Sequence, residues 1–330
     1  MSRGDLDVVT IGNALVDVIS SEDDRFLEIN GLTRGTMALI DSVRAEELYA
    51  GMGPATEASG GSAANTAVGL ASLGSAVGYI GRIRDDQLGG VFAHDIQASG
   101  VRFDNPQVSE GQPTGRCLII VTPDAQRTMN TFLGAASELG PADIDHAMVK
   151  SAAVTYCEGY LYDEAAAMEA IRAAAATVHA AGNRFALTLS DPFCVERHRE
   201  EFRRLVCDEV DVLFANEVEI CALYEENDFD TAARQAHSDC EIAALTRSEL
   251  GSVVLGDGEK HAVPALRIDD VVDTTGAGDL YAAGFLHGLT HDAPLSECGR
   301  LGAIAAAEVI GHYGARPVTP LADLVREFAG

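Results

Sequence analysis

Asp273-Thr274-Thr275-Gly276-Ala277-Gly278-Asp279 is a loop of small and polar residues, and an Ala- and Leu-rich run follows it to Leu289. The preceding residues, 265–272, are predicted to be extended, and the run after the loop is predicted to be a buried helix. A glycine loop at a helix start leaves backbone N–H groups unpaired, and these groups and the helix dipole favour an anion, above all a phosphate. The carboxylate of Asp279 would repel a phosphate, so it is a poor phosphate ligand. Its presence instead indicates a catalytic role, in which it removes a proton from the hydroxyl that attacks the phosphate. The alternative is a plain helix cap with an aspartate in the first turn.

The composition is typical of a chain that buries a sizeable core. The 330 residues are enough for one large α/β domain with an insertion or for two modest domains, and 47% of them are hydrophobic. The net charge of −28 argues against nucleic acid or an anionic membrane as a partner. No apolar run reaches membrane-spanning length, and residues 1–5 lack a signal-peptide pattern, so a cytoplasmic location is expected.

The spacing of cysteine, histidine and glycine residues argues against several kinds of site. The seven cysteines contain no Cys-x-x-Cys, which predicts reduced, mostly buried thiols. The nine histidines show no zinc spacing, and no Gly-x-x-x-x-Gly-Lys of a P-loop kinase occurs. A dinucleotide-dependent enzyme is disfavoured because no Gly-x-Gly-x-x-Gly follows the first predicted strand.

Polar residues follow the first predicted strand, residues 7–12. Asn13 and Asp17 come at its carboxyl end, where open α/β sheets bind ligands. A carboxylate accepts hydrogen bonds from two hydroxyls at once, so this pair suits a vicinal diol. A turn with an Asx cap is the alternative. Further along, a second glycine loop at 60–61 opens another small-residue helix, which contains Asn65.

From residue 137 onward, predicted strands alternate with predicted helices, and this alternation favours a parallel, doubly wound sheet. The strands are expected at 154–157, 185–190, 211–215 and 242–246, with an Ala-rich helix at 165–181. Before this region, residues 113–122 and 127–133 are predicted to form a hairpin around 123–126.

The loop and helix over residues 273–286 resemble the C-terminal signature of the ribokinase-like (PfkB) family of carbohydrate and nucleoside kinases. The resemblance implies that the backbone of Gly276, Ala277 and Gly278 forms an anion hole and that Asp279 is the catalytic base. It also implies a ribokinase-like α/β fold: a doubly wound, mostly parallel sheet flanked by helices, with a small inserted β-sheet lid.

Two N-terminal segments carry the same resemblance. Residues 60–74 are similar to the family's N-terminal signature, which implies that Gly61 and Asn65 contact the substrate. The Gly-Asn-x-x-x-Asp spacing that begins at Gly12 looks most like adenosine kinases, which implies substrate contacts for Asn13 and Asp17.

Asn216 and Glu219 match the family's Asn-x-x-Glu motif, which implies that they hold Mg²⁺, through water, and the phosphates of ATP. Oxygen ligands acting through water are what magnesium prefers. The alternative is a helix N-cap with an acidic first turn. Both interpretations are compatible, because Asn216 can cap the helix and still face the metal.

The remaining nucleotide contacts are implied by a turn and by the C-terminal loop. The turn from Thr246 to Gly251 resembles the family's Thr-x-Gly-x-x-Gly turn beside the nucleotide phosphates, although Ser248 replaces a glycine or a charged residue. Thr275 and Gly278 of the C-terminal loop complete the predicted ATP site.

The resemblance also implies how the chain is divided. Residues 1–330 are predicted to be a single domain, with a lid formed by about 14–53 and 105–136. Arg127 falls where adenosine kinases carry a lid arginine that reaches the transferring phosphate, and a surface salt bridge is the alternative. A small-residue helix is expected at 301–313, where family members bind the adenine.

Together these motifs predict an ATP-dependent kinase that transfers the γ-phosphoryl group of Mg-ATP to a primary alcohol of a sugar or nucleoside, with an adenosine-type nucleoside favoured. One alternative is a kinase for a free sugar such as fructose, ribose or 2-keto-3-deoxygluconate. Another is a non-catalytic ligand sensor that kept the fold. The expected partners are the small-molecule acceptor and Mg-ATP, with the chain a monomer or a homodimer.

Overall fold

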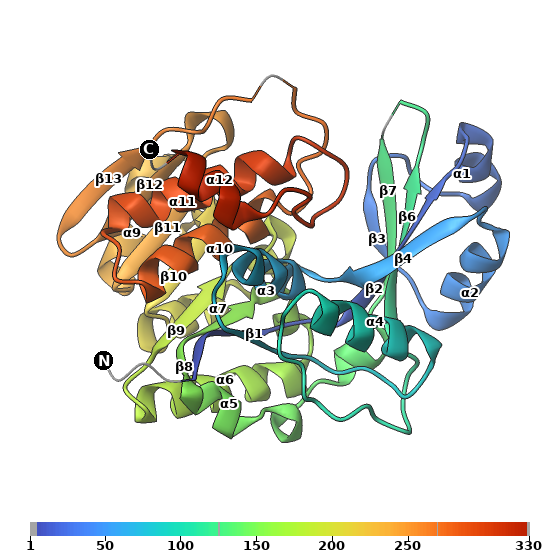
Figure 1. Cartoon of the computed structure of the whole chain (residues 1–330), viewed down its shortest axis with the longest axis horizontal. Helices are drawn as coiled ribbons and strands as arrows, with labels where there is room; N and C mark the ends of the chain where they lie inside the picture. The colour runs from blue at the N-terminus through green and yellow to red at the C-terminus, as the bar shows by residue number, and fades with distance from the viewer. Residues whose placement is uncertain (1–4, 125, 269, 329–330) are drawn as a thin grey trace.

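The computed structural model describes residues 5–124, 126–268 and 270–328, and these residues form two β-sheets (Figure 1). Within them the larger sheet has eight strands in the order β13-β12-β11-β10-β9-β8-β1-β5. The six neighbouring strands β5, β1, β8, β9, β10 and β11 pair in parallel, whereas β12 and β13 at one edge pair in an antiparallel manner. In chain order they are β1 (Leu6–Ile11), β5 (Val77–Ile80), β8 (Ala152–Glu158), β9 (Arg184–Thr188), β10 (Val212–Asn216), β11 (Ile242–Thr246), β12 (Ser252–Gly256) and β13 (Glu259–Val263).

Helices cover both faces of the larger sheet, because successive strand residues point to opposite sides. Along β1, Val9 and Ile11 pack in one buried cluster, whereas Val8 packs in a second one. The first cluster includes residues of α5 (His146–Ser151), α6 (Ala165–Ala180), α7 (Pro192–Asp208), α8 (Glu217–Tyr224) and α9 (Phe229–Asp239). The second includes residues of α3 (Ser62–Leu73), α4 (Gln87–Ala98), α10 (Ala277–Thr290), α11 (Leu295–Val309) and α12 (Leu321–Phe328).

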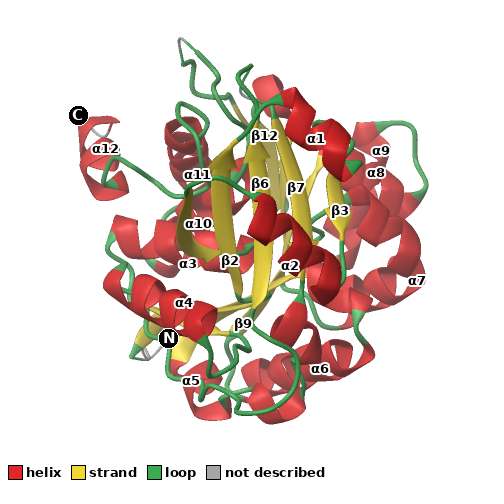
Figure 2. Cartoon of the chain, turned by 90° about the vertical axis from the view of Figure 1, so that its right-hand side faces the viewer, coloured by secondary structure: helices red, strands yellow, loops and turns green. Residues whose placement is uncertain are grey.

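A smaller sheet stands beside the larger one, with α1 (Asp24–Asn30) and α2 (Ser42–Gly51) on its outer side (Figures 1 and 2). Its strand order is β3-β7-β6-β2-β4. Val18 and Ile120 lie in a buried cluster with Leu27 of α1 and Leu48 of α2. The strands are β2 (Leu15–Ser21), β3 (Met37–Leu39), β4 (Ala55–Gly60), β6 (Gly115–Val121) and β7 (Arg127–Phe132).

The α/β fold class predicted from the sequence is confirmed, with a mainly parallel sheet flanked by helices and a second, small sheet. The predicted strands at 7–12, 154–157, 185–190, 211–215 and 242–246 are all present within a residue or two at most of their expected ends. None of the helices in the described residues is long and apolar enough to cross a membrane.

Some local details differ from the predictions. The described part of 265–272, which was predicted to be extended, forms no β-strand, and residue 269, like residue 125 of the predicted 123–126 turn, lies outside the described residues. The helix expected at 301–313 is α11, which ends at Val309, because the carbonyl of Ile310 accepts hydrogen bonds from Val272 and Asp273 instead of continuing a helix. The sequence analysis also did not predict helices α1 and α2 or the β12–β13 hairpin.

Close packing of α10 against α11 predicts a stability effect. A Cβ atom added to Gly284 would overlap the carbonyl oxygen of Leu301, whereas one added to Gly90 of α4 would meet no atom within 4 Å. We expect Gly284→Ala to lower the free energy of unfolding by about 1–3 kcal/mol through overpacking. Gly90→Ala, the matched control, should leave it unchanged or raise it by up to about 1 kcal/mol through helix propensity. Urea unfolding measures both, and equal effects would contradict the packing argument.

Candidate active site

The loop before α10 has the geometry of an anion-binding helix start. Gly276 precedes the first turn with φ 79°, a left-handed conformation that favours glycine, and a Cβ there would meet the Cβ of Ala315 at 2.6 Å. Ala277 donates its N–H to the carbonyl of Thr274 at 3.2 Å. Among the described residues, the N–H groups of Gly276 and Gly278 donate no hydrogen bond, so both are available to a ligand.

Asp279, in the first turn of α10, is held by two donors from α3. Its Oδ1 accepts a hydrogen bond from Ser62 Oγ at 2.6 Å, and its Oδ2 accepts one from Asn65 Nδ2 at 2.9 Å. Burial raises the pKa of Asp279, while these two donors and the charge of Arg316 act in the opposite direction. The two glycine loops singled out in the sequence therefore meet at this carboxylate.

A buried carboxylate that the sequence analysis missed fixes Asn13. Glu158, at the end of β8, accepts from the backbone N–H and the side-chain Nδ2 of Asn13 at 2.9 and 2.7 Å, and from Ala63 N at 2.8 Å. The side chain of Glu158 is buried, and burial raises its pKa to about 7. Because the amide nitrogen of Asn13 is engaged, its Oδ1 is the atom left to accept a hydrogen bond from a ligand. In the sequence, the only local sign that Glu158 could belong to the site is that an acidic residue and a glycine follow the predicted strand 154–157.

Asp17 of β2 lies against the second glycine loop. A Cβ on Gly60 would overlap the Asp17 carboxylate, and one on Gly61, whose φ is 100°, would overlap the carbonyl of Asn13. Among the described residues the Asp17 carboxylate accepts no hydrogen bond, and burial raises its pKa to about 6. Asp17 is therefore an acceptor without a partner beside the same loop that starts α3.

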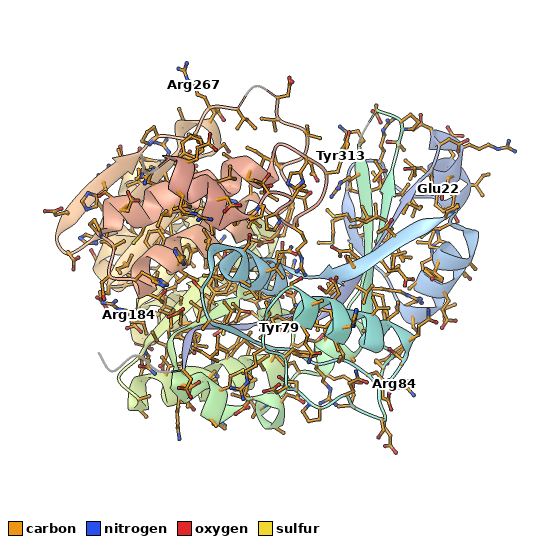
Figure 3. All side chains as sticks on the ribbon, in the orientation of Figure 1. Glu22, Tyr79, Arg84, Arg184, Arg267 and Tyr313 are labelled. Atoms are coloured by element: carbon orange, nitrogen blue, oxygen red, sulfur yellow. The ribbon has the colours of Figure 1, made fainter. Side chains whose placement is uncertain are left out.

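Arg127 links the small sheet to the loop before α10. Its Nη1 lies 2.9 Å from Asp273 Oδ2, and each side chain is only 9% exposed. The guanidinium also lies over the ring of Tyr313, 5.8 Å from its centroid, and Figure 3 shows Tyr313 where the larger part of the molecule faces the small sheet. Burial alone would raise the pKa of Asp273, but hydrogen bonds from Thr275 and Gly314 and the charge of Arg127 hold it below its usual value. The salt bridge considered as the alternative for Arg127 is thus present, but it is buried.

Asn216 and Glu219 form a complete capping box at the start of α8. Glu219 N donates to Asn216 Oδ1 at 2.9 Å, and the Glu219 carboxylate accepts from Asn216 N at 2.9 Å and Asn216 Nδ2 at 2.6 Å. The described residues contain no group of three or more His, Cys, Asp or Glu placed to hold a metal ion directly. Only one carboxylate is present here, and each of its oxygens already accepts a hydrogen bond, so this pair fits a hydrated Mg²⁺ better than a directly coordinated one.

The turn predicted to lie beside the nucleotide phosphates follows β11. Thr246 ends that strand and pairs with Ser252, and Gly251 has φ 87°, where a Cβ would overlap the carbonyl of Val263. Ser248 has φ 49°, in the left-handed region. Because a left-handed conformation favours glycine, a glycine would suit this position of the family pattern. The serine that stands here instead is therefore strained.

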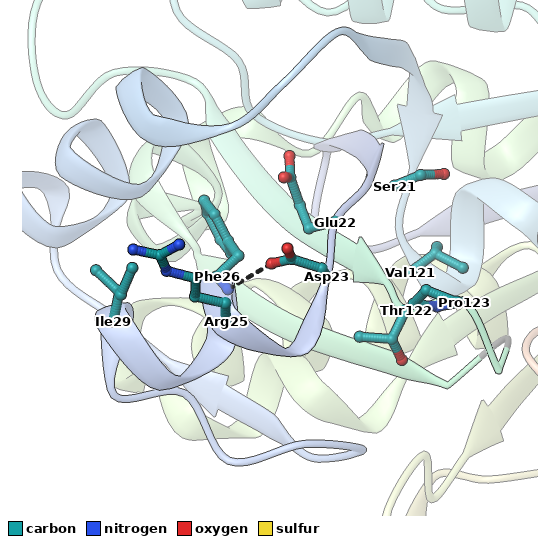
Figure 4. A pocket seen from close by; sticks show the side chains of 9 residues that line it. All are labelled: Ser21, Glu22, Asp23, Arg25, Phe26, Ile29, Val121, Thr122 and Pro123. Atoms are coloured by element: carbon teal, nitrogen blue, oxygen red, sulfur yellow. Dashed lines mark hydrogen bonds between the residues drawn. The ribbon is translucent and has the colours of Figure 1, made fainter.

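A shallow pocket lies elsewhere, at the tip of the small sheet (Figure 4). It lies between the end of β2, helix α1 and the turn after β6, with Phe26 and Ile29 on one side and Val121 and Pro123 on the other. Asp23 in its wall is already occupied in capping α1, through a 3.0 Å hydrogen bond from Phe26 N. None of the residues predicted for the candidate active site lines this pocket.

Comparisons with known proteins agree with this arrangement. Residues 36–322 match the family described as pfkB family carbohydrate kinase. The chain belongs to the PfkB family. It is therefore a phosphotransferase with an alcohol group as acceptor, and the family resemblance seen in the sequence is confirmed.

Individual relatives differ in the substrate that their names state. An ATP-dependent ribose-1-phosphate kinase from Halopiger xanaduensis is 30% identical over 279 residues, covering 82% of this chain and 86% of that protein. The crystal structure of a probable sugar kinase from Rhizobium etli is 49% identical, covers 99% of both chains and has a TM-score of 0.92. That of adenosine kinase from Sinorhizobium meliloti is 53% identical, covers 98% of this chain and 99% of its own, and has a TM-score of 0.91.

The capping box predicts a pH effect on stability. Burial raises the pKa of Glu219 from 4.5 to about 7, so the folded chain binds a proton that the unfolded chain releases between these values. Glu219 therefore lowers stability as pH rises from about 4.5 to about 7. In Glu219→Gln the fall in Tm between pH 5 and pH 7.5 should be smaller than in the wild type. Exposed Glu200 of α7 provides the control: Glu200→Gln should keep the wild-type pH dependence, and the same dependence in Glu219→Gln would refute this assignment.

Proposed function

We propose that this PfkB-family kinase transfers the γ-phosphoryl group of Mg-ATP to the primary alcohol of a nucleoside, with adenosine as the favoured acceptor. The observation that carries the proposal is the partnerless carboxylate of Asp17 beside the loop that also reaches Asp279. A ribose diol supplies two donors to one carboxylate, and the free Oδ1 of Asn13 supplies another acceptor. The 53% identity to a protein named adenosine kinase supports the same choice.

In the proposed mechanism, Asp279 accepts the proton of the acceptor hydroxyl. Ser62 and Asn65 fix its carboxylate by two hydrogen bonds, so its orientation is set before the substrate arrives. A carboxylate is a weak base, but that suffices if the proton moves late, after most of the phosphoryl group has left ATP. The unpaired N–H groups of Gly276 and Gly278, with Ala277, would stabilise the negative charge on the phosphoryl oxygens.

The nucleotide side is assigned from residues at the carboxyl edge of the larger sheet. Asn216 and Glu219 would hold hydrated Mg²⁺, which supplies charge neutralisation at the phosphates. Thr246 and Gly251, with Thr275, would position the phosphates. Arg127 would also neutralise the negative charge of the phosphates once its contact with Asp273 rearranges. Residues 14–53 and 105–136, which include most of the small sheet, would form the lid over the acceptor.

An aromatic side chain that no motif marked also suits a nucleoside. Tyr160 comes directly after β8 and Glu158, is partly buried, and donates its hydroxyl to the carbonyl of Ser190 at 3.3 Å. Burial raises the pKa of Tyr160, and the charges of Asp191 and Asp279 add to that rise, so its hydroxyl lies within electrostatic reach of the proposed base. Such a ring offers a base of the acceptor a surface for stacking.

A free-sugar kinase is the second candidate. Gly61, Asn65 and the loop before α10 would serve a sugar equally well, and two similar proteins are named as a ribose-1-phosphate kinase and a probable sugar kinase. The distinction lies in Tyr160, because a free ribose would offer Asp17 the same diol, whereas only a nucleoside carries a base that could stack on the ring. Because the chain belongs to a family of kinases, the ligand-sensor alternative is not retained.

The role of the base predicts a large loss of turnover. Asp279→Asn keeps the size of the side chain and removes the proton acceptor, so kcat should fall by about 10²-fold or more while ATP binding is largely kept. Asp292 lies just beyond the other end of α10 and is exposed, so Asp292→Asn is the matched control and should keep wild-type kcat. If Asp279→Asn retains more than about a tenth of the activity, another group takes the proton.

The acceptor assignment predicts discrimination at the 2′-hydroxyl. Asp17 would lose a charge-assisted hydrogen bond with 2′-deoxyadenosine, so kcat/KM should be about 10- to 100-fold lower than for adenosine. Asp17→Ala should abolish most of this difference, whereas Asp24→Ala, on the exposed surface of α1, should preserve it. Efficient phosphorylation of a free hexose or ribose, with none of adenosine, would refute the nucleoside proposal and leave the kinase assignment standing.

A further inference from the structure

Three consecutive residues after α11 contact separate parts of the candidate active site. Gly314 N donates to Asp273 Oδ2 at 3.0 Å, and Ala315 packs directly against Gly276. Arg316 donates from Nη2 to both oxygens of Ser59, at 2.6 Å to the carbonyl and 2.9 Å to the hydroxyl. This segment therefore joins the phosphate-side loop before α10 to the end of β4.

Ser59 is fixed from two sides. It is buried and immediately precedes Gly60 and Gly61, the loop against which Asp17 lies. Its N–H and its hydroxyl both donate to Asp95 Oδ2 of α4, at 2.8 and 2.5 Å, while its two oxygens accept from Arg316. A cation and an anion thus hold one serine in place, and both charges strengthen its hydrogen bonds.

The guanidinium of Arg316 has a hydrogen-bond donor that Ser59 does not use. Its Nε is buried and has no acceptor among the described residues, and within those residues Arg316 makes no direct ion pair. Leaving a buried donor unpaired is costly, so an oxygen of a bound ligand is the expected partner. Arg127, the other cation that acts on Asp17, likewise has a buried Nε without an acceptor among the described residues, but it is paired with Asp273 at 2.9 Å, whereas Arg316 has no such carboxylate partner there.

We propose that Arg316 is a positioning residue for phosphoryl transfer: it holds the Ser59–Gly61 loop in place and supplies the positive charge that offsets Asp17 and Asp279. The proposal rests on the roles proposed above for these two aspartates, but it does not depend on whether the acceptor is a nucleoside or a sugar.

The charges around the two aspartates explain why such a cation is needed. Asp279 accepts hydrogen bonds from Ser62 and Asn65 of α3, and its charge adds to the rise in the pKa of Tyr156, Glu158 and Tyr160. Asp17 faces Cys117 of β6, besides Asp279 and the two arginines. Burial raises the pKa of Asp17 and of Asp279, and the positive charge of Arg316 opposes that rise at both carboxylates more strongly than any other charge. Without it, both carboxylates would hold their protons to higher pH.

The test is the pH dependence of kcat/KM, measured with the acceptor that the wild type uses best. In Arg316→Gln the acid limb, the side of the profile on which kcat/KM falls as pH is lowered, should shift to higher pH by about one unit, because the carboxylates lose a nearby opposite charge. As a result, kcat/KM at pH 7 should fall by about 10-fold or more. Arg316→Lys keeps the charge but loses the guanidinium donors, so its acid limb should stay and its KM for the acceptor should rise. Ser59→Ala removes one acceptor of Arg316 and should also raise KM without moving the limb.

The control is Arg300→Gln, which removes an arginine of α11 that pairs with Glu297, and its profile should match the wild type. An unmoved acid limb in folded Arg316→Gln overturns the proposal, as does an Arg316→Lys limb that moves equally far. Circular dichroism shows whether Arg316→Gln folds; if it does not, an unchanged KM in both Arg316→Lys and Ser59→Ala overturns the proposal. If the wild type phosphorylates a sugar and not adenosine, the nucleoside assignment fails while the Arg316 test proceeds with that sugar.

Discussion

The contact between the first turns of α3 and α10 is the constraint on which the site depends. Ser62 and Asn65 reach Asp279 only because the two helices approach closely, and Gly69 permits that approach: a Cβ there would meet Leu280 Cδ1 at 2.6 Å. Both helices begin at glycine loops, so their unpaired N–H groups come to the same edge of the sheet. The substrate-side loop and the phosphate-side loop are thus placed opposite each other by helix packing.

Gathering carboxylates at this edge has an electrostatic cost. Burial raises the pKa of Asp17 to about 6 and that of Glu158 to about 7, and it raises the pKa of Asp279 as well. The chain offsets this with donors: two N–H groups and an amide for Glu158, and a hydroxyl and an amide for Asp279. Asp17 alone lacks a donor among the described residues, which is why an acceptor with hydroxyl groups suits it.

Two arginines connect the parts of the molecule around this edge. Arg127 extends from β7 of the small sheet to Asp273, and Arg316 extends from the C-terminal segment to Ser59 beside the substrate loop. Both guanidiniums act on Asp17. A movement of the small sheet relative to the larger one would therefore change the charge around the acceptor at the same time as its enclosure, which couples closure to electrostatics.

Features that depend on local backbone chemistry could be predicted from the sequence. Glycine loops before small-residue helices and the alternation of strands and helices led to the fold class and to Asp279. The family resemblance implied Asn65 and Asp17, and Asp17 lies inside β2 rather than at the end of β1. The tertiary structure decided the partners: Glu158 for Asn13, Asp273 for Arg127, and Ser59 for Arg316. These residues lie far apart in the chain: Ser59 and Arg316 are separated by 257 in residue number. No spacing along the chain encodes such a pair, because its members meet only when helices and strands pack.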